Sequence, residues 1–225
     1  MDDELPRAGE GRLTSRPGGP PPGAPAPAGL HRLDLPGAEA LLAVPPGEPG
    51  PCPLLVFFHG AGGTAEHGLA AVGRPAGDRG VLVLATTSAA STWDLIAGGL
   101  GRDVAVLDAA LERVHGLAEV GATALAGFSD GASYALSLGL ANGDLAGAVL
   151  AFSPGFAAPP ARVGRPRVRV SHGTADRVLP VDRCGRRVVR QLTGAGYDVT
   201  YDEFDGGHVL TPSLVDAALD WWLPG

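Results

Sequence analysis

The sequence contains no lysine, only two cysteines and no long apolar run, and each absence excludes a class of protein. Without lysine, no glycine-rich loop of this chain can be a Walker-type phosphate-binding loop, which needs a lysine after its last glycine. Cys52 and Cys184 are too few for a disulfide framework, and neither has the spacing of a metal site. No apolar stretch approaches the roughly 20 residues that span a bilayer, so we expect no integral membrane association.

Positive charge is also scarce. The formal net charge is −7, and all 17 basic residues are arginine. Because binding to nucleic acid needs clustered positive charge, we expect no nucleic acid partner.

The opening residues Met1–Glu4 lack the basic start and the apolar run of a signal peptide, which predicts a cytoplasmic protein. We expect a monomer or a small homo-oligomer.

Two regions differ in composition. Residues 1–29 hold seven Pro and six Gly. So few apolar side chains cannot offset the entropy of ordering such a segment, which predicts a disordered tail. Residues 30–225 have the mixed composition of one globular domain, long enough for its own core.

Short runs rich in Val, Leu and Phe alternate with longer segments of helical period over residues 30–225. This alternation is typical of an α/β fold, a mostly parallel sheet of about eight strands with helices on both faces. The first two predicted strands, separated by Pro36-Gly37, suggest an antiparallel hairpin. The strands are expected at 30–35, 40–44, 54–58, 81–86, 123–128, 146–152, 167–171 and 199–204. The helices are expected at 64–77, 102–115, 130–141, 182–194 and 212–223.

The most informative motif is Gly127-Phe128-Ser129-Asp130-Gly131, a G-x-S-x-G between a predicted strand and a predicted helix. This context is the one in which the motif holds a nucleophilic serine in a strained turn, with its hydroxyl at the carboxyl edge of the sheet. The alternative is a glycine-rich turn with a serine that caps the helix. The other parts of a serine hydrolase follow in the right order, which favours Ser129 as a nucleophile.

An acid and a base follow two later strands. Asp176 lies after the strand 167–171, where a carboxylate can orient a histidine and stabilise its charged form. His208 lies in Asp205-Gly206-Gly207-His208 after the last strand, where an imidazole reaches the same edge. The chain order Ser, Asp, His is that of α/β hydrolases. Asp182 is a rival acid, but a helix N-cap explains it better.

The loop His59-Gly60-Ala61-Gly62-Gly63 follows the strand 54–58. Its backbone can approach a ligand closely, and the N–H groups of Ala61 and Asp130 are predicted to bind an oxyanion. The side chain of His59 is expected to bond to the loop rather than to act in catalysis. The candidates for lining a substrate pocket are His59, Gly60, His67 and Trp93.

Together Gly127–Gly131, His59–Gly63, His172–Asp176 and Gly206–His208 resemble the α/β-hydrolase superfamily. The set is similar to the small esterases grouped with carboxylesterases, phospholipases and polyhydroxyalkanoate depolymerases, over roughly residues 30 to 225. The resemblance implies a catalytic triad of Ser129, Asp176 and His208 with no metal or organic cofactor. It also implies an open site, because the long insertion that forms a large cap domain in many lipases is missing.

The expected activity is hydrolysis of carboxylic esters of small or medium acyl chains through an acyl-enzyme on Ser129. A thioesterase acting on acylated protein or coenzyme A is an alternative with the same chemistry. An acyltransferase would use the same intermediate with an alcohol in place of water. A non-catalytic binding member of the fold is an alternative of another class.

Overall fold

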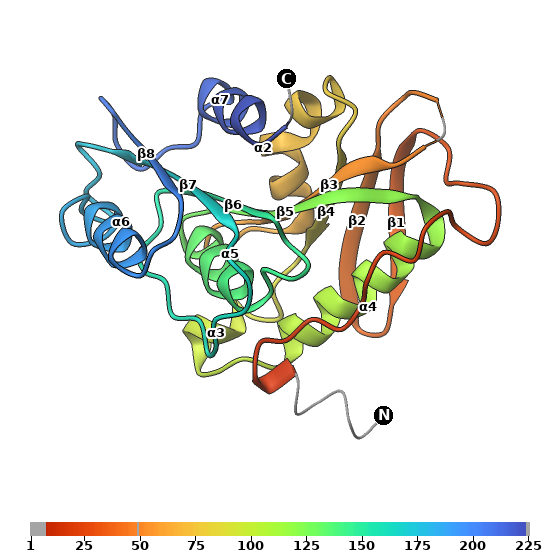
Figure 1. Cartoon of the computed structure of the whole chain (residues 1–225), viewed down its shortest axis with the longest axis horizontal. Helices are drawn as coiled ribbons and strands as arrows, with labels where there is room; N and C mark the ends of the chain where they lie inside the picture. The colour runs from red at the N-terminus through yellow and green to blue at the C-terminus, as the bar shows by residue number, and fades with distance from the viewer. Residues whose placement is uncertain (1–7, 49, 224–225) are drawn as a thin grey trace.

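A computed structural model describes residues 8–48 and 50–223. Eight strands form one sheet in the order β1-β2-β4-β3-β5-β6-β7-β8 (Figure 1). The first two strands are antiparallel to each other, β2 is antiparallel to β4, and all other neighbours are parallel. The predicted α/β fold with about eight strands is confirmed. The strands are β1 Gly29–Leu35, β2 Ala38–Val44, β3 Cys52–Phe58, β4 Leu82–Thr86, β5 Val120–Phe128, β6 Ala148–Phe152, β7 Arg167–Gly173 and β8 Val199–Phe204.

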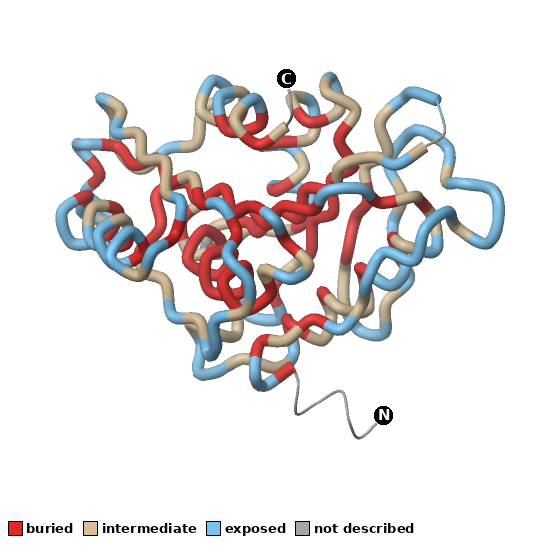
Figure 2. Tube along the Cα trace, in the orientation of Figure 1, coloured by how far each residue is buried: buried red, intermediate tan, exposed pale blue. Residues whose placement is uncertain are grey.

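Helices cover both faces of this sheet. The alternation of side chains along each strand divides the core in two, as in β3, where Val56 packs on one face and Phe57 on the other. One face is covered by α4, α5 and α6, and the other by α2 and α7 (Figure 1). Buried residues concentrate in the central strands and in α5 (Figure 2). The helices are α2 Ala65–Gly77, α3 Asp94–Ala97, α4 Arg102–Leu117, α5 Asp130–Ala141, α6 Gly185–Gly194 and α7 Pro212–Trp222.

The connections at the carboxyl ends of the strands are short. The longest are 87–101, which contains the four-residue helix α3, and 153–166. Neither forms a domain of its own, so the described residues contain no large cap domain. No helix among them is long and apolar enough to cross a membrane.

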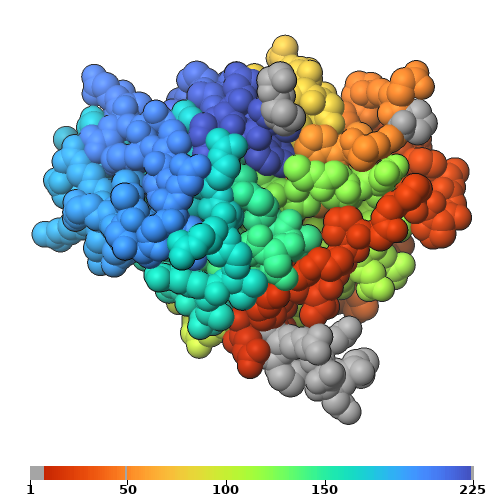
Figure 3. All heavy atoms as spheres, in the orientation of Figure 1, coloured from red at the N-terminus to blue at the C-terminus, as the bar shows by residue number. Residues whose placement is uncertain are grey.

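The segment 8–28 differs from the predicted disordered tail, because it packs along the domain near α4 (Figure 3). Leu13 is buried in the main core, and its N–H donates to the side chain of Asn142 at 2.9 Å. The backbone at Gly11 lies close enough to Leu100 and Pro160 that a Cβ there would be 2.9 and 3.0 Å from their side chains. The segment is ordered because single residues such as Leu13 and Gly11 contact the domain. The average composition of the segment does not reveal such contacts. Residues 1–7 of the predicted tail lie outside the described residues.

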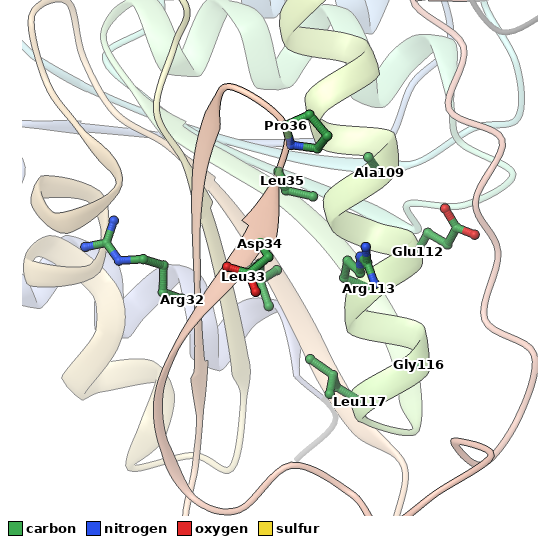
Figure 4. A pocket seen from close by; sticks show the side chains of 10 residues that line it. All are labelled: Arg32, Leu33, Asp34, Leu35, Pro36, Ala109, Glu112, Arg113, Gly116 and Leu117. Carbon is green, nitrogen blue, oxygen red and sulfur yellow. The ribbon is translucent and has the colours of Figure 1, made fainter. Parts of the chain in front are cut away.

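A cavity of about 610 Å³ lies between the edge strand β1 and α4 (Figure 4). Apolar and charged side chains line it together, among them Leu35, Ala109 and Arg113. Strands β2, β4 and β3 separate β1 from β5, the strand that leads into Ser129. This cavity is therefore not part of the site formed around Ser129.

Candidate active site

The turn at Ser129 has the strained geometry expected of the motif. Ser129 lies between the end of β5 and the start of α5 with φ 59° and ψ −120°, a conformation that residues other than glycine rarely adopt. Both motif glycines are required by close backbone contacts. A Cβ at Gly131 would lie 2.1 Å from the carbonyl oxygen of Phe58, and one at Gly127 would lie 2.3 Å from the oxygen of Gly131. The start of α5 can therefore lie against the ends of β3 and β5 only because Gly131 and Gly127 have no side chains.

The structure brings together the three predicted catalytic side chains. His208 Nε2 lies 2.8 Å from Ser129 Oγ, and His208 Nδ1 lies 2.6 Å from Asp176 Oδ2. The three residues follow β5, β7 and β8, so they share the carboxyl edge of the sheet. The ring of Phe128 packs against the His208 ring, with centroids 4.8 Å apart. The result is a continuous hydrogen-bonded chain from a buried carboxylate to a serine hydroxyl.

Asp176 is held as a carboxylate. Its side chain is fully buried, and Oδ1 accepts the N–H groups of Val178 and Leu179 at 2.9 and 2.8 Å. Burial by itself would raise the pKa of Asp176, but the hydrogen bonds from His208, Leu179 and Val178 outweigh it and lower the pKa below its ordinary value. An ionised acid is the form that can orient and stabilise a histidine.

The rival acid, Asp182, is not brought to the site. Its carboxylate pairs with Arg186 at 2.7 Å and is mostly exposed. The expected N-cap role of Asp182 is also wrong, because α6 begins at Gly185 with Cys184 as its N-cap, three residues later than predicted. Residues 181–184 form a turn that a pattern of helical period does not distinguish from the helix itself.

The glycine-rich loop after β3 lies beside the serine. A Cβ at Gly60 would be 3.5 Å from the Cβ of Ser129, so this backbone borders the nucleophile directly. Within the described residues, the N–H groups of Ala61 and Asp130 donate to no backbone acceptor, whereas Gly62 N–H donates to Ser91 O at 2.6 Å. Free N–H groups at a helix start and a neighbouring loop are suited to bind a developing negative charge.

His59 supports this loop, and its ring nitrogens bond to the backbone rather than to a triad residue. It is buried, its Nδ1 lies 2.7 Å from Gly60 O, and Ser88 N–H donates to its Nε2 at 3.1 Å. The proton must therefore be on Nδ1, because a carbonyl only accepts. Burial is the main cause that lowers the pKa of His59 below its ordinary value. The ring is a neutral brace between two loops.

This brace predicts a pH dependence of stability. The folded protein resists protonation of His59, whereas the unfolded chain takes up the proton at the ordinary value near 6.5. The stabilisation that neutral His59 contributes to the free energy of unfolding should therefore be complete above about pH 6.5. It should decline as the pH falls below that value. Urea denaturation from pH 8 to pH 5 measures this, and His59→Asn should flatten the decline. A residual slope is expected from His115, whose pKa burial also lowers. An unchanged slope in the variant would contradict the assignment.

Trp93 does not line a pocket as predicted, because it is 1% exposed. Its ring stacks on Tyr134 at 4.9 Å and meets Phe58 edge-on at 5.0 Å. Its Nε1–H donates to the carbonyl oxygen of His59 at 2.9 Å. Trp93 therefore supports the glycine-rich loop through this hydrogen bond, and its aromatic neighbours explain why it is buried. The other pocket candidate, His67, is exposed in the first turn of α2 beside Thr64.

Two attachments of the surrounding loops were not predicted. Asp130, the first residue of α5, accepts a hydrogen bond from Thr92 at 2.7 Å and so fastens the loop 87–101. One turn further along α5, Ser133 Oγ accepts the N–H of Gly155 at 2.9 Å and fastens the loop 153–166. The sequence signal for both was polar residues in the first turns of an otherwise apolar helix.

Within the described residues, no cluster of His, Cys, Asp and Glu is placed to hold a metal.

Known proteins share this fold. Esterase PE8 is 25% identical with a TM-score of 0.64, and the match covers 80% of this chain and 97% of that chain. TT1662 from Thermus thermophilus is 26% identical with a TM-score of 0.65, over 88% of this chain and 98% of that one. The fluorophosphonate-binding serine hydrolase F of Staphylococcus aureus is 13% identical with a TM-score of 0.72, over 87% and 98%.

No protein-family profile matches the chain, and no curated protein sequence matches it. The identification therefore depends on structure. The sheet order, the strained serine turn and these structural likenesses show that the chain has the α/β-hydrolase fold.

Proposed function

We propose that this protein is a serine esterase that hydrolyses carboxylic esters through an acyl-enzyme on Ser129. The observation that carries the proposal is the unbroken hydrogen-bonded chain from Asp176 through His208 to Ser129. A histidine held in this way can remove the serine proton while the serine oxygen attacks a carbonyl carbon. The name of esterase PE8, at 25% identity, supports the same reaction class.

The mechanism follows from the contacts. His208 Nε2 takes the proton of Ser129 as Oγ bonds to the ester carbonyl carbon, and the carbonyl electron pair moves to oxygen. The N–H groups of Ala61 and Asp130 stabilise that oxyanion. His208 then gives its proton to the departing alkoxide, which leaves as the alcohol. Water, deprotonated by His208, attacks the acyl-enzyme, and Ser129 takes the proton back as the acid leaves.

We expect esters of small or medium acyl chains as substrates, at a site that short loops border and that no cap domain of the described residues encloses. The substrate is thus a small molecule. A cytoplasmic location and a monomeric or small oligomeric state stay predictions from the sequence.

A fluorophosphonate reagent tests the proposal. Such reagents phosphonylate an activated serine, so one equivalent should label Ser129 and stop turnover of p-nitrophenyl butyrate together. Peptide mass spectrometry of the full chain locates the label, and heat-unfolded protein serves as the control that should stay unlabelled. Ester turnover by fully labelled protein would refute the role of Ser129. Parallel assays with matched oxyesters and thioesters separate an esterase from a thioesterase.

A further inference from the structure

A second histidine contacts the triad acid. His172 lies near the end of β7, and its side chain is completely buried. Its Nε2 is 2.7 Å from the carbonyl oxygen of Leu179 and 3.3 Å from Asp176 Oδ2. Because a carbonyl only accepts hydrogen bonds, Nε2 carries a proton, which it donates to Leu179 O, and the same polarised N–H lies next to the carboxylate oxygen Oδ2.

The oxygen that His172 approaches is the one that holds the catalytic base. Asp176 Oδ2 lies 2.6 Å from His208 Nδ1, so two imidazoles lie on a single carboxylate oxygen. Leu179 closes the arrangement, since its N–H donates to Asp176 Oδ1 at 2.8 Å while its carbonyl oxygen accepts from His172. The turn 176–179 is thus fastened at both its carboxylate and its backbone.

The ring of His172 has no room to turn. Helix α6 begins directly on it, and a Cβ at Gly185 would lie 2.6 Å from Nδ1 and 2.9 Å from Cγ. Within the described residues Nδ1 has no hydrogen-bond partner. A flip about the Cβ–Cγ bond would replace Nε2 by Cε1 and lose the hydrogen bond to the carbonyl of Leu179. Close packing therefore fixes which nitrogen faces the acid.

The charged groups around His172 come from three elements. Asp176 follows β7, and His208 lies beyond that carboxylate. On β8, Glu203 is the register partner of His172, and Arg186 of α6 neutralises this glutamate through contacts at 2.6 Å. With Glu203 neutralised by Arg186, the carboxylate that acts on the His172 N–H is that of Asp176, 3.3 Å away.

We infer that His172 is a positioning residue that sets the place and the hydrogen-bonding strength of the triad acid. This inference rests on the proposed function of the triad. By holding the turn 176–179, His172 keeps Oδ2 where His208 needs it. Its polarised N–H, 3.3 Å from Oδ2, also stabilises the charge on that oxygen and so limits how strongly the acid favours a charged His208.

The test compares His172→Phe with His172→Gln in the full chain, using p-nitrophenyl butyrate. Phenylalanine fills the space without a donor, whereas glutamine keeps an N–H near the position of Nε2. We expect the Phe variant to lose about 10- to 100-fold in kcat with KM within about twofold, because the acid is misplaced while the substrate site is intact. The pH midpoint of kcat/KM should rise by about half a unit, because the charge on Oδ2 is then no longer partly stabilised by the His172 N–H and favours a charged His208 more strongly. Glutamine should restore most of kcat and return the midpoint.

Two results would overturn the inference. One is a folded Phe variant with the kcat and midpoint of the unaltered protein. The other is a loss of kcat with an unmoved midpoint that glutamine does not rescue, which indicates a packing role alone. If the Phe variant does not fold, ¹⁵N-histidine NMR of the unaltered protein decides, since the inference requires the His172 proton on Nε2 and a proton on Nδ1 refutes it. This spectrum does not depend on ester hydrolysis, so an inactive protein would refute the proposed function separately.

Discussion

Replacing Ser129 with alanine is expected to lower kcat for p-nitrophenyl butyrate by about 10⁶-fold, the loss found when the nucleophile of a comparable triad is removed. Both halves of the proposed reaction require the acyl-enzyme on Ser129 Oγ, which lies 2.8 Å from the base. Alanine removes that oxygen and leaves His208, Asp176 and the loop after β3 in place. Steady-state turnover over several decades of enzyme concentration measures the loss.

The chain offers a matched control in Ser153. It follows β6, the strand next to β5, and it also has a positive φ, 51°, and is buried. Its hydroxyl has no hydrogen-bond partner within the described residues. Ser153→Ala should therefore keep its turnover while making the same chemical change in a similar backbone. Equal rates for Ser129→Ala and Ser153→Ala, both folded, would mean that the nucleophile lies elsewhere.

Gly131→Ala is the second change with a large expected effect. The new Cβ would lie 2.1 Å from Phe58 O and 2.5 Å from His59 O, both of which are backbone atoms that cannot swing aside. The start of α5 must move away from β3, which should cost about 3 kcal/mol of the free energy of unfolding. For a domain of this size, that lowers Tm by about 6 to 12 °C. The same displacement separates Ser129 from Gly60, so activity should fall even at temperatures where the variant is folded.

Gly73→Ala serves as the control for this change. Gly73 lies inside α2, and a Cβ there meets nothing within 4 Å. Alanine should leave stability unchanged or raise it by up to about 1 kcal/mol, since it is the better helix former. Calorimetry and urea denaturation of the two variants give the comparison. A Gly131→Ala protein as stable as Gly73→Ala would show that β3 and α5 do not meet as closely as described.

The sheet could be predicted because its strands carry a local signal. Runs such as Leu54–Phe58 are apolar on both faces, which only a strand buried between two layers of helices requires. The relation of Ser129, Asp176 and His208 was also predictable, since parallel strands bring their carboxyl ends to one edge. Each residue needed only to be placed after the right strand. Neither inference depended on a contact between side chains.

Other features depend on such contacts, and there the sequence was a poor guide. Trp93 was expected in a pocket, but its ring is buried by Tyr134 and Phe58, which are distant in sequence. The four residues of α3 are too few to show a helical period. His172 stands in a motif that was noticed for its aspartate, yet only the fold reveals that its ring reaches the acid and the turn that follows.

The segment 8–28 has a practical consequence for protein production. A region so rich in Pro and Gly would ordinarily be trimmed before expression, with a shorter clone starting near residue 30. Here the cut would remove Leu13 from the core and the backbone of Gly11 from its contacts with Leu100 and Pro160. These two contacts belong to the loops 87–101 and 153–166, so the trimmed protein would expose an apolar strip and loosen both loops at once.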